Sequence, residues 1–109
     1  MAEPSEFRLT HHARKRMVQR MGLNKRAGDR TFRRAVTTGM WRSEMSDSLR
    51  RMCDAYWQRP HHQAGKASDY ILSGGHVFIM RGTVCVTVIG IPKMISIRFL
   101  AENRRRQQR

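Results

Sequence analysis

Residues 70–100 read YILSGGHVFIMRGTVCVTVIGIPKMISIRFL and hold ten of the twelve Val and Ile residues of this 109-residue chain. Apolar and polar residues alternate over much of this stretch, which is the period of a half-buried strand. Glycine and proline turn signals interrupt the alternation at Ser73-Gly74-Gly75, Arg81-Gly82 and Pro92-Lys93. The stretch therefore predicts an antiparallel meander of four strands, over residues 70–72, 76–80, 83–91 and 95–100.

Two or three helices are predicted before this meander, and Phe7 and Leu9 indicate a short edge strand at the start. Thr10 and Asp29 are favourable N-caps, and glycine is favoured just after a helix. A third helix follows from apolar residues at i, i+3, i+4 and i+7. The predicted segments are helices over 11–21 (before Gly22), 30–38 (before Gly39) and 47–57 (with Leu49, Met52, Cys53 and Tyr56 on its apolar stripe), then a loop over 61–68 after Pro60.

The fold class predicted from this order is α+β, with two or three N-terminal helices packed on one face of a four-stranded antiparallel β-meander. The helices are expected to cover the side that carries Val84, Val86 and Val88. The opposite side, with its threonines and Arg98, is expected to stay open, and such an acid-free face suits RNA. One domain over residues 1–100 and a basic C-terminal tail over 101–109 are predicted.

The chain is strongly basic, with 22 Lys and Arg against 8 Asp and Glu and a formal net charge of +14. This charge favours a polyanionic partner, because side chains that neutralise phosphates release the counterions of a nucleic acid. RNA is the expected partner, and DNA is the weaker expectation. No apolar run is long enough for a membrane span, and Cys53 and Cys85 are too few for a disulfide scaffold. The composition excludes membrane proteins, disulfide-rich secreted proteins and multidomain enzymes, and it favours a cytoplasmic location.

The stretch LTHHARKRMVQRMG, residues 9–22, carries the candidate site. Residues four apart lie on the same side of a helix, so His12, Arg16 and Arg20 form one stripe. An imidazole can move a proton, and a guanidinium group binds two phosphate oxygens at once. The stripe therefore indicates phosphate chemistry. The remaining candidate RNA contacts are Arg8, His11, Arg14, Lys15, Arg81, Arg98, Arg104, Arg105 and Arg106.

The motif L-T-x-H-A-x-x-R-M-x-x-R at residues 9–20 is followed by Gly22-Leu23 and later by the strand-like run 86–89, VTVI. In this order the motifs resemble a small branch of the barnase–EndoU–colicin–RelE superfamily of metal-independent ribonucleases, whose members occur in toxin modules and phage genomes. The resemblance implies an inhibitor (antitoxin) as a further partner, and the arginine-rich tail suggests a ribonucleoprotein assembly as an alternative. Residues 40–69 are longer than that branch leads us to expect, which marks them as a candidate helical insertion.

The resemblance implies RNA cleavage by the neighbouring 2′-hydroxyl, which leaves a 2′,3′-cyclic phosphate and needs no metal or other cofactor. His12 would carry a proton, while Arg16 and Arg20 would stabilise the charge that develops on the phosphate. The hydroxyl of Thr87 would position that phosphate. His76, and after it Arg81, would be the candidate for the second proton carrier.

Other functions have weaker support in the sequence. A non-catalytic RNA-binding protein on the same scaffold would stack bases on aromatic residues, for which the candidates are Trp41, Tyr56 and Trp57. The eight acids are scattered, which argues against a Mg²⁺-dependent nuclease. A thiol nucleophile at Cys85 is disfavoured, because a cysteine that alternates with threonines in a strand is usually packing. A zinc site would have to use Cys53, His61, His62 and His76, whose spacing matches no known zinc motif.

Overall fold

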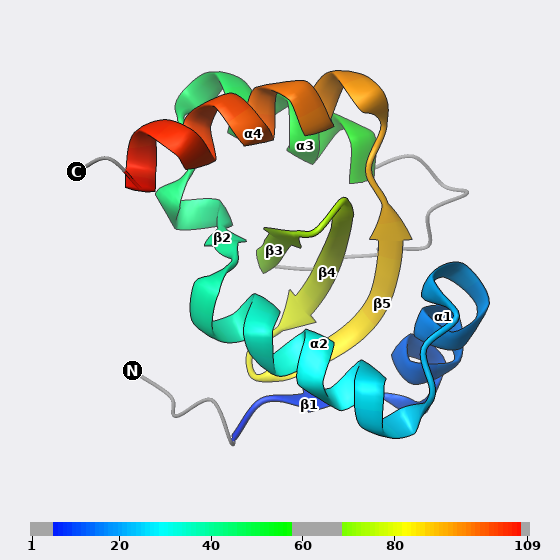
Figure 1. The fold of residues 1–109 in the computed structure, drawn as a ribbon. Coiled ribbons are helices and arrows are strands. Elements are labelled where there is room, and N and C mark those ends of the chain that lie inside the picture. The colour runs from blue at the N-terminus through cyan, green and yellow to red at the C-terminus, as the bar shows by residue number, and fades with distance from the viewer. Residues whose placement is uncertain (1–5, 58–68, 108–109) are drawn as a thin grey trace.

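The computed structural model describes residues 6–57 and 69–107, and within them four α-helices lie on the two faces of a five-stranded mixed β-sheet (Figure 1). The helices are α1 (His11–Met21), α2 (Lys25–Thr38), α3 (Asp47–Trp57) and α4 (Lys93–Gln107), and a 3-10 turn, η2 (Arg42–Glu44), precedes α3. The strands are β1 (Arg8–Leu9), β2 (Met40–Trp41), β3 (Asp69–Ser73), β4 (His76–Arg81) and β5 (Val84–Gly90). The predicted α+β class is confirmed. The loop predicted over 61–68 lies outside the described residues.

The sheet has the order β1-β5-β4-β3-β2, in which β1 runs parallel to β5 and the other neighbours are antiparallel. The predicted hairpin is confirmed, because β3 and β4 are joined at Gly74 and Gly75, which have φ angles of 55° and 82°. The predicted edge strand is also confirmed as β1. The predicted four-stranded antiparallel meander is wrong: only β3, β4 and β5 form a meander, and the two-residue strands β2 and β1 flank it, with β1 parallel to β5.

The predicted fourth strand, 95–100, is wrong, because this segment forms the first half of helix α4. Its apolar residues fit both periods. Ile95 and Phe99, four residues apart, lie on the same face of a strand and also on the same side of a helix. Pro92 immediately precedes the helix, and its carbonyl accepts from the Ser96 N–H at 3.0 Å. Proline is tolerated at a helix start, since its missing N–H would not be used there. Residues 101–107, predicted as a tail, continue α4.

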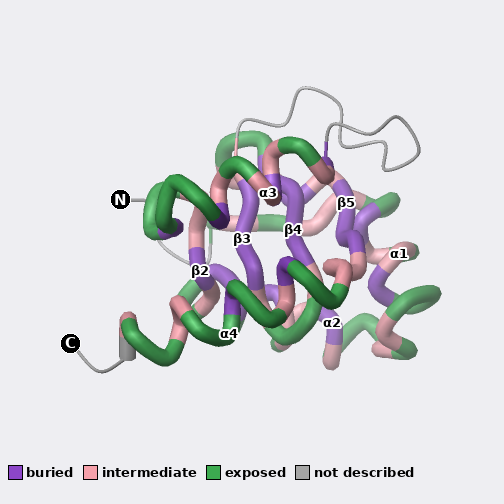
Figure 2. Tube along the Cα trace, turned by 90° about the horizontal axis from the view of Figure 1, so that it is seen from above, coloured by how far each residue is buried: buried purple, intermediate pink, exposed green. Residues whose placement is uncertain are grey.

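Helices cover both faces of the sheet, so the predicted packing on one face is wrong (Figure 1). Figure 2, seen from above, shows the strands buried between helices whose outer faces are exposed. One core cluster joins α1 and α2 to the sheet, through Ala13, Met17, Phe32, Ala35, Val36, Ile71, Phe78, Met80, Cys85 and Val88. The other joins α3 and α4 to it, through Leu49, Cys53, Trp57, Tyr70, Leu72, Val77, Ile79, Ile89, Ile95 and Phe99 with Met40 and Met45.

The predicted division of the third strand of the meander into a valine side and a threonine side is wrong because of a β-bulge. Thr87 pairs with Ile79 and Cys85 pairs with Met80, so Val86 is an extra residue between the two pairs. The bulge puts Cys85 on the α1–α2 side and Thr87 on the α3–α4 side, because residues paired across antiparallel strands share a face. Both are buried, so no open threonine face remains.

The ends of α1 are capped as predicted, whereas α2 starts earlier than predicted. The Thr10 hydroxyl accepts from the Ala13 N–H at 3.0 Å, and Gly22 ends α1 with a φ of 66°. Helix α2 begins at Lys25, five residues before the predicted start, because Asn24 caps it by accepting from the Ala27 N–H at 2.9 Å. Asp29, the predicted cap, lies within the helix. The predicted end of α2 at Thr38 is confirmed, and both predicted ends of α3 are confirmed as well.

A polar cluster holds η2 and α3 against the sheet. The Arg42 guanidinium donates to both oxygens of Asp54, at 3.2 and 2.9 Å, and the Tyr70 hydroxyl donates to the same carboxylate. Burial and this hydrogen bond raise the pKa of Tyr70 well above its usual range. The cluster gives residues 40–46, for which the sequence indicates no regular element, a defined place beside α3.

Candidate nucleic-acid interface

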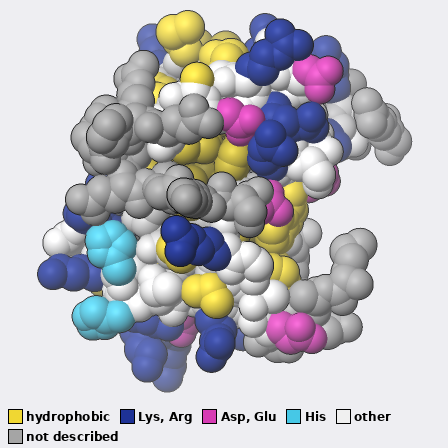
Figure 3. Space-filling model, turned by 180° about the vertical axis from the view of Figure 1, so that it is seen from behind, with side chains coloured by type: hydrophobic (Ala, Val, Ile, Leu, Met, Phe, Trp, Pro, Cys, Tyr) yellow, Lys and Arg dark blue, Asp and Glu magenta, His cyan; other side chains and the backbone are white. Residues whose placement is uncertain are grey.

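Helices α1 and α2 form a layer whose charge is almost entirely positive. Residues 11–38 contain nine Lys and Arg and one acid, Asp29. By contrast, α3 carries two arginines and two aspartates. On the face seen from behind, Lys and Arg side chains gather round the histidines over the lower part of the molecule, where these helices lie (Figure 3). The α1–α2 basic surface is defined here as Arg8, Arg14, Lys15, Arg16, Arg20, Lys25, Arg26, Arg30, Arg33 and Arg34.

The outer side of α2 contributes the largest part of this surface. Arg26, Arg30 and Arg33 are exposed and lie at i, i+4 and i+7, so they form one stripe. The opposite side of the helix buries Phe32 and Ala35 in the core. None of these arginines was among the predicted RNA contacts, although Arg30 and Arg33 lie within the predicted helix 30–38 and only Arg26 precedes it. Their spacing opposite the apolar stripe was the signal that could have identified them.

Arg14 connects α1 to α2 and lies at the centre of the surface. Its guanidinium forms an ion pair with Asp29 at 2.7 Å, which occupies the only acid of the two helices. Arg14 also lines two shallow hollows. One lies between β1, α1 and α2 and is lined by Phe7, Arg8, Leu9, Arg14, Asp29, Phe32 and Arg33. The other lies along α1 and is lined by His11, Arg14, Lys15, Val18 and Gln19. The surface is therefore continuous across the two helices.

The predicted His12 stripe is present on α1. Arg16 Nε donates to His12 Nε2 at 3.5 Å, and Arg16 Nη1 donates to the Gln19 side-chain oxygen at 3.2 Å. The guanidinium group of Arg16 therefore lies next to the His12 ring. His12 is exposed, and so is Arg20, one helical turn beyond Arg16. His12, Arg16 and Arg20 thus lie along one side of α1.

The structure does not bring the other two predicted catalytic residues to this stripe. Thr87 is 4% exposed and lies on the α3–α4 side of the sheet, whereas His12 lies on the opposite side. His76 pairs with Gly90, while α1 is attached to β5 through Thr10, which hydrogen-bonds to the carbonyls of Cys85 and Val86. Four residues along a strand span roughly 13 Å. Neither residue is therefore placed beside the His12 imidazole.

The remaining predicted RNA contacts divide into two groups. Arg81 lies at the same end of the sheet as Arg8, because both pair with Val84, but its neighbour Met80 faces α1 and α2, so Arg81 points to the other face. Neighbouring strands are about 4.8 Å apart. The arginines of α4 lie across the sheet, and two of them have protein partners. Arg106 forms an ion pair with Glu44 at 2.8 Å, and Arg98 donates to the Ser48 hydroxyl.

The alternative sites receive no support from the described residues. Burial raises the pKa of the Cys53 and Cys85 thiols to about 12, so neither is a nucleophile at neutral pH. Within residues 6–57 and 69–107 no group of three or more His, Cys, Asp or Glu side chains is placed to hold a metal ion. His61 and His62 lie outside those ranges. Among the aromatic candidates, Trp57 is buried in the core. Trp41 is half-buried; it packs on Phe7 and donates to the Val36 carbonyl.

No helix in the described part of the chain has the length and apolar character needed to cross a bilayer. Comparison of the chain with models of protein families, with curated proteins and with solved structures found no match. The chemistry of the α1–α2 basic surface is therefore the principal guide to function.

Proposed function

We propose that this chain is an RNA-binding protein that holds the phosphate backbone of RNA on the α1–α2 basic surface. The observation that carries the proposal is the excess of nine Lys and Arg over one acid in residues 11–38, with that acid already paired to Arg14. Within the described residues, no other cation of the two helices forms an ion pair with a carboxylate, and a polyanion is the partner that suits such a surface.

Two features favour RNA as the polyanion. The hollow between β1, α1 and α2 places the half-buried ring of Phe7 beside Arg8 and Arg33. An aromatic ring next to guanidinium groups offers an unpaired base a surface for stacking, while the arginines hold its phosphates. The resemblance of residues 9–23 to metal-independent ribonucleases points to the same ligand. Single-stranded RNA therefore suits the surface better than a regular duplex does.

Metal-independent cleavage of the bound RNA is a second candidate function, and the contact between Arg16 and His12 favours it. In this reaction the neutral imidazole takes the proton of a 2′-hydroxyl, whose oxygen attacks the adjacent phosphorus. Arg16 and Arg20 stabilise the added negative charge, and the 5′-oxygen leaves with a proton from a second carrier. Among the described residues, no other histidine and no carboxylate forms a hydrogen bond or ion pair with His12, so binding is the better supported function.

One experiment tests both functions. The purified protein is incubated with end-labelled single-stranded RNA in EDTA, and equal samples are run on native and denaturing gels. We expect the native gel to show a shifted complex. If the second function holds, the denaturing gel shows fragments that end in cyclic phosphate, and His12→Ala lowers cleavage by about 10²–10⁴-fold while the shift remains.

His11→Ala is the matched control, because it removes a histidine from the same helical turn but from a different side of α1. It is expected to leave cleavage within about threefold of the parent, since it has no contact with Arg16. An unshifted RNA on the native gel would contradict RNA binding. Fragments that persist unchanged in His12→Ala would contradict the assignment of His12 as the proton carrier.

A further inference from the structure

Helix α4 exposes an apolar stripe to solvent. The exposed fractions of Met94, Ile97 and Leu100 are 74%, 59% and 55%, and these are three of the four large apolar residues exposed in the described part of the chain. Their spacing of three residues puts them on one side of the helix. The other side of α4 buries Ile95 and Phe99 against the sheet. A helix that is apolar on opposite sides is expected to be covered on both.

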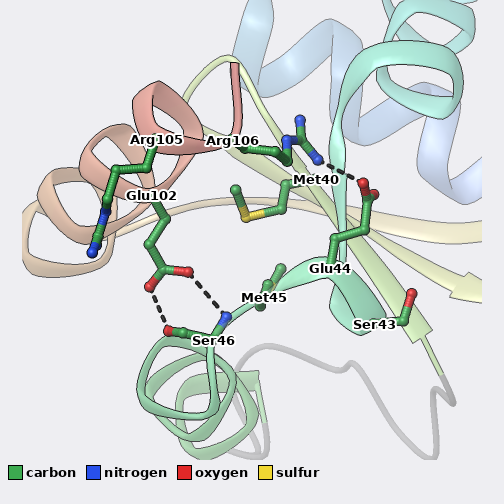
Figure 4. A pocket seen from close by; sticks show the side chains of 8 residues that line it. All are labelled: Met40, Ser43, Glu44, Met45, Ser46, Glu102, Arg105 and Arg106. Carbon is green, nitrogen blue, oxygen red and sulfur yellow. Dashed lines mark hydrogen bonds and ion pairs between the residues drawn. The ribbon is translucent and has the colours of Figure 1, made fainter. Parts of the chain in front are cut away.

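The charges that border this stripe are all positive. Lys93 precedes it, Arg104 follows it, and Arg98 and Arg105 lie along one edge. The only acid of α4, Glu102, is turned away: its carboxylate accepts from the backbone N–H of Ser46 at 3.0 Å and from the Ser46 hydroxyl, and its side chain is only 10% exposed (Figure 4). The outward surface of α4 is therefore both apolar and basic.

A groove runs along the other edge of the stripe. It has a volume of about 390 Å³ and separates α4 from the turn between β3 and β4. Leu100 and Asn103 line it on the helix side, and Gly74 and Gly75 line it on the turn side. Neither glycine has a neighbouring atom within 4 Å of the position of a Cβ, so the turn leaves open space there. Such a groove can take the side chains of a partner that lies along α4.

We propose that the outward face of α4 binds an acidic amphipathic helix of a partner protein. The apolar side chains of that helix would cover Met94, Ile97 and Leu100 and enter the groove, and its carboxylates would pair with the bordering Lys and Arg. A second copy of this chain is disfavoured, because two such faces would bring like charges together. A flat anionic bilayer would leave the groove unfilled. The site lies across the sheet from the α1–α2 basic surface and does not depend on RNA binding.

The test measures the fluorescence anisotropy of a labelled synthetic helix of about 20 residues. Its leucines stand at i, i+3, i+4 and i+7 on one side, and glutamates fill the other positions. We expect the protein to bind this peptide, and the double substitution Ile97→Ser with Leu100→Ser to weaken binding by at least about tenfold. Both side chains are exposed, so this variant should fold, which its thermal melt verifies.

Two controls isolate the stripe. Val18→Ser removes an apolar side chain that is 51% exposed on α1, and it should leave peptide binding unchanged. A peptide with the same composition but scrambled order, which has no apolar side, should bind at least about tenfold more weakly than the amphipathic one.

Three results would overturn the proposal. The first is equal binding of the scrambled and amphipathic peptides, or binding of neither. The second is binding of phosphatidylserine-containing vesicles, but not of the peptide, with loss in the double variant. The third is a dimer of the free protein in sedimentation that the double variant converts to a monomer.

Discussion

Replacement of Arg26, Arg30 and Arg33 by glutamine is expected to lower the affinity for single-stranded RNA by about 50-fold at about 0.15 M salt. The three arginines form the exposed stripe of α2, and each is expected to contact one phosphate. For single strands each contact contributes about −0.7 to the slope of log affinity against log salt, so this slope should become shallower by about 2. Glutamine retains most of the side-chain volume and the helix propensity of arginine. Titration of a labelled RNA by anisotropy at several salt concentrations gives both quantities.

The matched control removes the same charge from the other side of the sheet. Lys93, Arg104 and Arg105 lie on α4 and are replaced by glutamine together. We expect this variant to lose less than about threefold in affinity, because its cations contribute only through screened long-range attraction. An equal loss of RNA affinity in the two variants would show that the affinity depends on net charge alone. It would contradict a defined RNA-binding surface on α1 and α2.

Substitution Gly39→Ala is expected to destabilise the fold by about 3 kcal/mol or more. The φ of Gly39 is −69°, which any residue adopts, so the cost does not come from backbone strain. A Cβ at this position would lie 2.6 Å from Ile71 Cγ2 and in contact with the Ala35 carbonyl oxygen. Both neighbours are fixed, one in the core and the other in α2. The thermal midpoint should therefore fall by about 10 °C or more, measured by circular dichroism.

Gly28→Ala is the control for this substitution, and it should stabilise the fold instead of destabilising it. Gly28 lies within α2, and its added methyl group would meet only the Met17 side chain, at 3.8 Å. Alanine is favoured over glycine inside a helix by about 0.5–1 kcal/mol, so the thermal midpoint should rise. A Gly39→Ala protein as stable as the parent would mean that α2 and β3 do not approach each other as described.

The elements that the sequence predicts correctly are those determined by local interactions. Helix α1 has its own cap at Thr10 and its own end at Gly22, so both limits can be identified without knowledge of the rest of the chain. The turn at Gly74 and Gly75 is equally local, because its positive φ angles require glycine. Gly39 shows the limit of such reasoning: the sequence marks it as the end of a helix, whereas its close contact with Ile71 depends on tertiary packing.

Helix α4 was missed because its periodicity is ambiguous. Ile95, Ile97 and Phe99 alternate as in a strand, and the exposed Ile97 completes that alternation although it lies away from the core. Only the packing of Ile95 and Phe99 on the α3 side of the sheet distinguishes a helix from a strand in this segment. The same exposed residues form the stripe on which we propose that a partner helix binds.

The candidate site was predicted in part, for similar reasons. The stripe of His12, Arg16 and Arg20 follows from helical spacing alone, and the structure retains it. The position of Thr87 depends on the bulge at Val86, which moves the threonine to the other side of the sheet. No local feature of the run 83–91 indicates that bulge. The spacing of Arg30 and Arg33 opposite the apolar stripe could have identified them, whereas Arg26 required the correct helix start at Lys25.

The measurement that tests phosphate binding most directly is the salt dependence of the affinity of the unmodified protein for single-stranded RNA. With about six phosphates held by the α1–α2 basic surface, the affinity should fall by about 300-fold between about 50 and 200 mM salt. A fall of less than about threefold over this range would show that few phosphates are neutralised. It would contradict the proposal that the charge of α1 and α2 serves to bind RNA.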